Sequence, residues 1–385
     1  MNFTTMMGFP ADLLTTLILV GLLTPSACYN FCNSSRSYMS LHVPTNIHQL
    51  RVGDISLVAG LGDSFTVANG ARSTTLFRVH EEYRGDSFSA GGRGAYEYGS
   101  TTFPNILRVF SRHLYGYALG PGNVTSFNAR FNMAEAGAAF RHMPVQARRL
   151  IYKMKNDPYI DFQNDWKIVN LFTGQHDQCM ACANMTKYSP AIYKNTVRQT
   201  LDILKENLPR TLVNLIEPFN LGLIEEMMRL DPFCYYASRF LECDCDIFTN
   251  KTQMQQLASG YGRALRDLVK TGRYDGNNTF AVVIQPFFRN FSLPRNGVRF
   301  VYLHGHHFTT RLYLYIILTN VLLQYIALDA LFFARDCFHF ASSAHGVLGI
   351  ALWNSMLSMP ADKATNVNID ANVMCPSTEY IPISN

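Results

Sequence analysis

The serine at the end of an apolar run is the first residue of the chain with an evident chemical use. Ile55 to Leu61 is apolar enough to predict a buried strand, and Gly62-Asp63-Ser64 follows it directly. Gly permits a sharp turn and Asp favours one, so Ser64 is displayed at the strand exit together with its backbone N–H. Acyl-transfer enzymes present a nucleophilic serine in this way. The local alternative is an ordinary strand-to-helix turn in which Ser64 caps the helix.

A serine nucleophile requires a base, because a neutral hydroxyl attacks poorly. Asp336-Cys337-Phe338-His339, near the other end of the chain, supplies a candidate. The spacing places the carboxylate and the imidazole on one side of a turn, where Asp336 orients His339 and the second ring nitrogen faces Ser64. By itself this pair is weak evidence, because a histidine beside Phe340 can also be a packing residue.

The two motifs together resemble the GDSL (SGNH) esterase family in their order and residue types. Longer motifs narrow the resemblance to the phospholipase B branch of that family. These motifs are Asn132 to Gly137, Met143 to Leu150, Asp165 to Gly174, Asp336 to Phe340 and Ala351 to Leu357. The resemblance extends from about Val43 to Pro376. Several long motifs in one order are far more specific than a single tetrapeptide.

The resemblance implies ester hydrolysis through an acyl-serine, without a metal or organic cofactor. Ser64 is then the nucleophile, His339 the general base and acid, and Asp336 the carboxylate that orients His339. The family also uses three donors to the developing oxyanion: the N–H of the nucleophile, a glycine and an Asn side chain. Gly137 matches the glycine, although close helix packing is an equally good explanation of a glycine there.

The third oxyanion donor is where this chain departs from the family. The family's Gly-Gly-Asn-Asp is replaced by Gly174-Gln175-His176-Asp177, so His176 stands in the place of the Asn. A neutral imidazole has one N–H and is able to substitute as a donor, but it is bulkier than an amide. Gln175 adds a side chain where the family has none. The departure predicts reduced activity or a changed substrate range.

The remaining pattern predicts a fold that brings these residues to one edge. Apolar runs predict strands at 55–61, 167–173, 211–216 and 280–284, and helical spacing predicts helices at 102–110, 144–156, 192–208, 252–269 and 344–357. Such alternation favours a parallel sheet covered on both faces, with the site at the carboxyl ends of the strands. The expected fold is a three-layer α/β/α sheet of the flavodoxin-like GDSL type.

Composition limits the partners that the chain is expected to have. Of its 385 residues, 48% are hydrophobic and 16% charged, which suits a large globular core. The net charge of +5 is too mild and too evenly spread to indicate nucleic acid. The expected partner is a phospholipid or lysophospholipid substrate, and peripheral contact with a membrane surface stays open.

The N-terminal region and the cysteines indicate a secreted protein. Residues 1–27 contain an apolar run and a small-residue zone typical of a signal peptide, although no Lys or Arg precedes them. Nine cysteines then favour disulfides over a metal site, because Cys179-x-x-Cys182 has no second matching pair. Sequons for N-glycosylation agree with a secretory route; they occur at Asn33, Asn123, Asn184, Asn250, Asn277 and Asn290.

The expected domain organisation is a signal peptide (1–27), an N-terminal arm (28–44), a hydrolase domain (45–360) and a C-terminal tail (361–385). An apolar insert at about 301–333 interrupts the hydrolase domain. It is interpreted either as a surface helix on the domain or on lipid, or as a gene-model artefact. A membrane span is rejected, because it would separate His339 from Ser64 across a bilayer. His304, His306 and His307 in this insert suggest a metal, but a solvated segment is favoured.

These observations predict a secreted, phospholipase B-like serine esterase. Two alternatives stay open. The first is a catalytically impaired lipid-binding protein that keeps the fold, which the changes at Gln175 and His176 motivate. The second is a general carboxylesterase that acts on small soluble esters. The phospholipid class of the substrate rests on the resemblance alone.

Overall fold

The computed structural model describes residue 32 and residues 37–240, 243–293 and 332–383. By residue contacts the chain divides at Ser37, and the unit from Tyr38 onwards contains nearly all described residues. The expected signal peptide, Asn33 and most of the apolar insert lie outside the described residues. In the described part of the chain, no helix is both long and apolar enough to cross a membrane.

A parallel sheet forms the centre of the unit from Tyr38 onwards. In the described residues its strands lie in the order β1 (Ile55–Gly62), β2 (Trp166–Phe172), β3 (Thr211–Ile216) and β4 (Phe280–Gln285). Nearly every strand residue is buried, because helices cover both faces. The register pairs Gly62 with Phe172, so β1 and β2 end together and the segments that follow them lie at one edge.

Irregular segments extend the sheet beyond β1. Val58 donates its N–H to Tyr115, and Gly60 exchanges hydrogen bonds with Phe131 and Met133. A flavodoxin-like sheet has its second strand at this place. Here short bridges at Tyr115 and Asn132 occupy that position in place of a regular strand.

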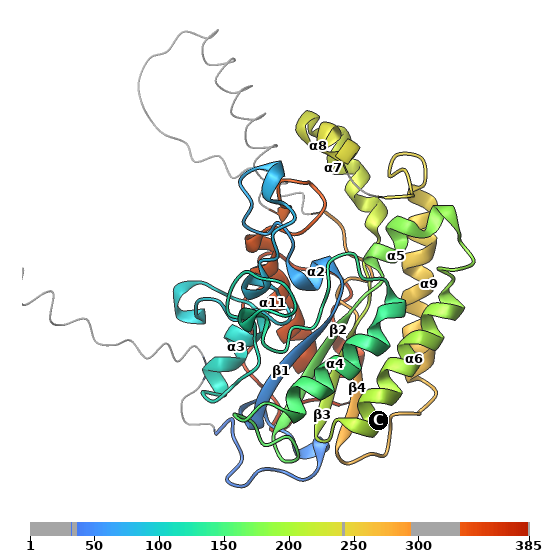
Figure 1. Ribbon diagram of the computed structural model, residues 1–385. Coiled ribbons are helices and arrows are strands. Elements are labelled where there is room, and N and C mark those ends of the chain that lie inside the picture. Colours follow the sequence, from blue (N-terminus) through green and yellow to red (C-terminus); the bar gives the residue numbers. More distant parts are fainter. Residues whose placement is uncertain (1–31, 33–36, 241–242, 294–331, 384–385) are drawn as a thin grey trace, which may run out of the picture. The chain divides into compact units, whose positions relative to one another are not determined.

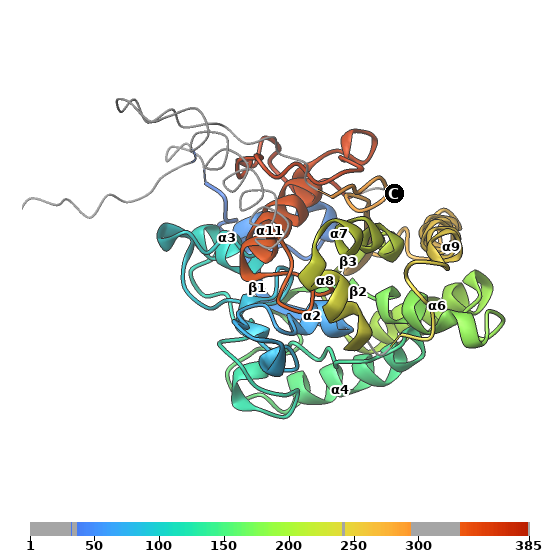
Figure 2. The ribbon, with the colours of Figure 1, turned by 90° about the horizontal axis from the view of Figure 1, so that it is seen from above.

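Helices form a layer on each face of the sheet (Figures 1 and 2). On one face α4 packs against α6 and α6 against α9; on the other, α3 packs against α11. Their bounds are α3 (Phe103–Phe110), α4 (Met143–Lys155), α6 (Pro190–Asn207), α9 (Lys251–Val269) and α11 (Ser342–Leu357). Proline in the first turn favours the start of α3, α4 and α6. The three-layer α/β/α prediction is confirmed, and every predicted strand and helix is present with bounds that differ by at most two residues.

Short helices follow the carboxyl ends of the strands (Figure 1). They are α2 (Ser64–Val67) after β1, α5 (Gln175–Met180) after β2, and α7 (Ile224–Leu230) and α8 (Pro232–Ala237) after β3. The sequence pattern predicts none of the last three, because six or seven residues are too few for a helical period to stand out. These helices carry several of the residues discussed below.

Disulfides hold the loops at this edge together. Cys179 bonds to Cys243, Cys182 to Cys245 and Cys234 to Cys337. The prediction that the cysteines form disulfides is therefore confirmed for these six residues. No cluster of residues suited to hold a metal ion occurs in the described ranges.

The segments on either side of the central domain pack against it. On the N-terminal side, the Ser40 N–H and hydroxyl both bond to the Asp54 carboxylate, at 2.7 and 2.8 Å. On the C-terminal side, the Trp353 indole donates to the Met374 carbonyl at 2.8 Å, and the Ile381 N–H donates to Leu50. Residues 38–44 and 361–383 thus lie against the same domain rather than apart from it.

Candidate active site

Ser64 lies at the exit of β1, as the first residue of α2, and is buried to all but 7%. Asp63 caps this helix: its Oδ1 accepts the Phe65 N–H at 3.1 Å. Glycine is required at Gly62, since a Cβ there would overlap the Phe172 carbonyl oxygen and the Thr66 side chain. The end of β1 therefore packs directly against the end of β2, and this contact sets the direction of the turn that displays Ser64.

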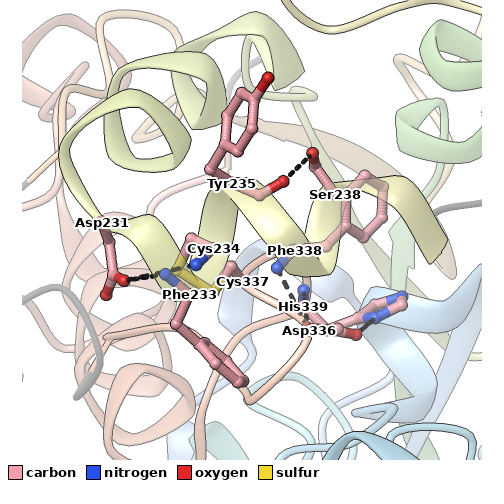
Figure 3. The surroundings of a disulfide bond; sticks show 9 residues. All are labelled: Asp231, Phe233, Cys234, Tyr235, Ser238, Asp336, Cys337, Phe338 and His339. Carbon is pink, nitrogen blue, oxygen red and sulfur yellow. Dashed lines mark hydrogen bonds and ion pairs between the residues drawn. A yellow bond between two sulfur atoms is a disulfide. The ribbon is translucent and has the colours of Figure 1, made fainter.

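The structure brings Ser64, Asp336 and His339 together. His339 Nε2 lies 2.8 Å from Ser64 Oγ, and His339 Nδ1 lies 2.6 Å from Asp336 Oδ2. Asp336 Oδ1 accepts the backbone N–H groups of Phe338 and His339, each at 3.0 Å (Figure 3). The carboxylate thus fixes both the turn and the imidazole that the turn carries.

The electrostatics of this trio favour one protonation pattern. Burial raises the pKa of Asp336, but the charge and hydrogen bond of His339 and the two backbone N–H groups outweigh it, and the net pKa is below the ordinary value. Asp336 is therefore ionised at neutral pH and accepts a hydrogen bond from the protonated Nδ1 of His339. The Nε2 of a neutral His339 is then an acceptor for the Ser64 hydroxyl proton.

The loop that carries Gly137 is tied to the strand and helix that carry Ser64. The Met133 and Glu135 N–H groups donate to Gly60 and Gly62, and the Asn132 amide donates to the Thr66 carbonyl at 3.0 Å. Gly137 itself is exposed with φ +70°, and no atom lies within 4 Å of where its Cβ would sit. Its conformation, rather than close helix packing, is what calls for glycine.

The backbone N–H groups of Ser64 and Gly137 bond to no other protein group in the described structure. Both belong to segments anchored on the end of β1, as given above. An N–H that has no protein partner is free to bind an anion or a developing negative charge.

His176 lies in the first turn of α5, immediately after Gly174, and its N–H points to Asp63 Oδ2 at 3.5 Å. Burial lowers the pKa of His176, and the charges of Arg141, His142 and His339 lower it further. The imidazole is consequently neutral at neutral pH, with one N–H to donate.

Two neighbours of His176 are buried without full hydrogen bonding. Neither amide atom of Gln175 has a partner among the described residues, although the residue is fully buried. Asp177 accepts the Phe140 N–H through Oδ2 at 2.8 Å, while its Oδ1 has no partner in the described part of the chain. Burial raises the pKa of Asp177 to about 8, so its carboxyl is protonated at neutral pH.

Gln146 supports the turn that carries Ser64, a role that the sequence pattern does not predict. It projects from α4, is fully buried, and its amide bonds twice to Gly62: Oε1 accepts the Gly62 N–H and Nε2 donates to the Gly62 carbonyl, both at 2.9 Å. The one feature of the sequence that could have indicated this role is that Gln146 is a polar residue on the apolar side of the predicted helix, one turn before Leu150. Gln146 therefore clamps the peptide groups that lead into Asp63 and Ser64.

Comparisons with known proteins agree with the predicted resemblance. A family model described as GDSL-like Lipase/Acylhydrolase matches residues 58–352. Phospholipase B1, membrane-associated, from Homo sapiens is 36% identical over 347 residues, which cover 87% of this chain and 22% of that protein. The Mus musculus protein of the same name is 35% identical over 347 residues, covering 87% of this chain and 21% of its own length. This chain thus spans about a fifth of the length of these relatives. The chain belongs to the GDSL-like lipase and acylhydrolase family.

Proposed function

We propose that this chain is a serine esterase that cleaves fatty-acyl esters of phospholipids or lysophospholipids through an acyl-serine. The observation that carries the proposal is the hydrogen-bonded series from Ser64 Oγ through the His339 ring to Asp336, with separations of 2.8 and 2.6 Å. Ser64 and His339 are 275 residues apart in the sequence, so no single local turn explains their contact. A nucleophile, a base and an orienting group in this order are the parts that acyl transfer needs.

The proposed reaction proceeds in two halves. Ser64 Oγ attacks the ester carbonyl carbon while His339 Nε2 takes the hydroxyl proton, and Asp336 stabilises the imidazolium. His339 then gives the proton to the leaving alcohol oxygen, and the acyl group stays on Ser64. In the second half water attacks the acyl-serine with His339 again as base, which releases the fatty acid and restores Ser64.

The proposed donors to the tetrahedral oxyanion are the N–H groups of Ser64 and Gly137 and the ring N–H of His176. The first two have no protein partner in the described structure, and the lowered pKa of His176 keeps its ring neutral. An oxyanion donor of this kind contributes roughly 10²–10³ in rate. His176 then does what an Asn amide does in other family members.

The phospholipid class of the substrate is carried over from relatives whose name is phospholipase B1. A general carboxylesterase with the same catalytic series would differ in preferring short soluble esters. The specific observation that favours a silent lipid-binding protein is Gln175, whose buried amide is unpartnered next to His176. Both alternatives are separated from the proposal by the assay below.

We further propose a secreted or luminal location with peripheral contact to a lipid surface. Disulfides persist in oxidising compartments. Three of the described sequon residues are exposed, Asn123, Asn184 and Asn290, while Asn250 and Asn277 are half-exposed, so all five are accessible for glycosylation. Cleavage after residue 27 and a hydrolase domain over about 45–360 complete the proposal.

The test compares lysophosphatidylcholine micelles with p-nitrophenyl butyrate, using the wild-type protein and Ser64→Ala. The proposal expects fatty-acid release from the micelles by the wild type alone. Hydrolysis of only the short ester would favour the general carboxylesterase. A folded wild type that hydrolyses neither substrate would contradict the esterase proposal and favour the catalytically impaired lipid-binding protein.

A further inference from the structure

The Cys234–Cys337 disulfide joins α8 to the turn that carries Asp336 and His339. Cys337 directly follows Asp336 and is two residues before His339. Its partner Cys234 lies in α8, 103 residues earlier in the sequence (Figure 3). Both cysteines are buried, at 4% and 3% exposure. The bond is therefore an internal connection at the candidate catalytic turn rather than a surface link.

The turn at Cys337 has a conformation that its own residue type disfavours. Cys337 has φ +55°, in the left-handed region that Gly and Asn tolerate better than other residues. The Cys337 N–H donates to Ala334, and the Ala334 N–H donates to His339, so the segment closes on itself. The positions of the Asp336 carboxylate and the His339 ring both depend on this closed turn.

The opposite end of the bond is anchored in α8. Asp231 caps this helix, and its Oδ1 accepts the N–H groups of Phe233 and Cys234 at 2.8 and 3.3 Å. Figure 3 shows α8 above the turn, with Cys234 projecting toward Cys337. A capped helix is a more rigid support than a loop.

Ring contacts link the same turn to Phe65, the residue after Ser64. Phe338 is buried and meets the His339 ring edge-on, with ring centroids 4.9 Å apart. Phe65 lies beside both, with its centroid 5.6 Å from Phe338 and 5.1 Å from His339. Because Phe338 and His339 pack together, a displacement of the turn displaces the imidazole relative to Phe65 and Ser64.

We propose that the Cys234–Cys337 disulfide is a positioning element for the esterase reaction: it holds the Asp336 to His339 turn against α8, so that His339 Nε2 stays within reach of Ser64 Oγ. The inference rests on the proposed function. It assigns the bond a catalytic consequence in addition to stabilisation of the fold. An error of about 1 Å in such a geometry lowers turnover by up to about 100-fold.

Cys182–Cys245 is the matched control. Its cysteines are 63 residues apart in the sequence, whereas Cys234 and Cys337 are 103 residues apart. The entropic stabilisation by a disulfide grows only with the logarithm of the loop length, so the two bonds should stabilise the fold to a similar extent. Its cysteines lie next to no member of the Ser64, Asp336 and His339 series in the sequence. Removal of either bond should lower the melting temperature by a similar amount, and only removal of Cys234–Cys337 should lower turnover.

The experiment measures kcat and KM on lysophosphatidylcholine and the rate of labelling by a fluorophosphonate, for folded C234A/C337A and C182A/C245A. For C234A/C337A we expect kcat and the labelling rate to fall by the same factor, 10-fold or more, with KM changed less than threefold. The C182A/C245A variant should keep both rates within twofold of the wild type. C234A/C337N should recover part of the loss, because Asn tolerates the left-handed φ at this position.

Two results would overturn the proposal: kcat within twofold of the wild type in folded C234A/C337A, or an equal loss in C182A/C245A. A wild type that neither labels nor hydrolyses would instead overturn the esterase function, which separates the two failures.

A second measurement on the wild type does not depend on the folding of variants. The protein is reduced for increasing times with a phosphine, alkylated and mapped by mass spectrometry. Loss of labelling should follow the reduced fraction of Cys234–Cys337. Full labelling of molecules in which this bond is open would contradict the proposal.

Discussion

The double hydrogen bond between Gln146 and Gly62 gives the sharpest prediction about how α4 supports the nucleophile. Gln146→Ala removes both bonds, each 2.9 Å long and buried, and leaves the Gly62 N–H and carbonyl without those partners. The Gly62 N–H is then left unpaired, which costs about 1–3 kcal/mol. The Gly62 carbonyl keeps the Glu135 N–H as a donor, so the loss of its bond to Gln146 costs only about 0.5–1.5 kcal/mol more. That is a large part of the usual stability of a domain.

The matched variant is Gln146→Glu, which keeps the shape of the side chain. An ionised Glu accepts the Gly62 N–H but places a second oxygen against the Gly62 carbonyl. A protonated Glu reproduces both bonds of Gln146. Folding therefore favours the protonated form and raises the pKa of this Glu above its unfolded value, so its stabilisation is present at low pH and is lost as pH rises through the folded pKa.

The assay is urea unfolding of each variant at pH 5 and pH 8, together with the fluorophosphonate labelling rate. We expect Gln146→Ala to lose about 1.5–4.5 kcal/mol at both pH values, and Gln146→Glu to lose less at pH 5 than at pH 8. Both variants should label more slowly at pH 8, because Gly62 leads directly into Ser64. The reasoning is refuted if Gln146→Ala loses less than about 1 kcal/mol and labels at the wild-type rate.

The remaining predictions concern the residues around the proposed oxyanion site and the orienting carboxylate. His176→Ala should lower kcat by about 100-fold, and His176→Asn should retain kcat within about tenfold because it restores an amide donor; equal kcat values for the two variants would argue against a donor role. Burial raises the pKa of Asp177 to about 8, so the folded protein keeps a proton that the unfolded chain releases near pH 4. Holding this proton lowers the free energy of unfolding as the pH rises from 4 to 8. Asp177→Asn removes the effect and should therefore raise the free energy of unfolding at pH 8 and make it depend less on pH. Unchanged urea-unfolding curves for Asp177→Asn at both pH values would contradict that pKa. Asp336→Asn should lower kcat by about 10⁴-fold with little change in KM, because an amide favours the wrong tautomer of His339; a loss below tenfold in steady-state kinetics would remove Asp336 from the reaction.

The strands and the long helices could be predicted because each has a strong local signal. Ile55 to Leu61 is an apolar run that ends at Gly62, and α4 carries buried residues at helical spacing, with a proline in its first turn. The rule that parallel strands present their carboxyl ends at one edge then places Ser64 near Gly174 without further information. These predictions use periods and boundaries that a single sequence contains.

The supporting contacts could not be predicted, because they depend on the packed structure. Nine cysteines allow many pairings, and nothing in the sequence selects Cys337 as the partner of Cys234. In the sequence, Gln146 is simply one polar residue of a predicted helix. Its two bonds to Gly62 exist only because α4 packs against the end of β1. The short helix α8 is evident only in the structure, where Asp231 caps it and a disulfide joins it to the turn that carries Asp336 and His339.

We propose above that Ser64 is a nucleophile and that His339 activates it. The most direct test treats the purified protein with a fluorophosphonate and locates the phosphonylated residue by peptide mass spectrometry, with Ser64→Ala and His339→Ala in parallel. We expect one adduct on Ser64 in the wild type, none in Ser64→Ala and at least 100-fold slower labelling in His339→Ala. A folded wild type that forms no adduct, or an adduct on another residue that persists in Ser64→Ala, would contradict it.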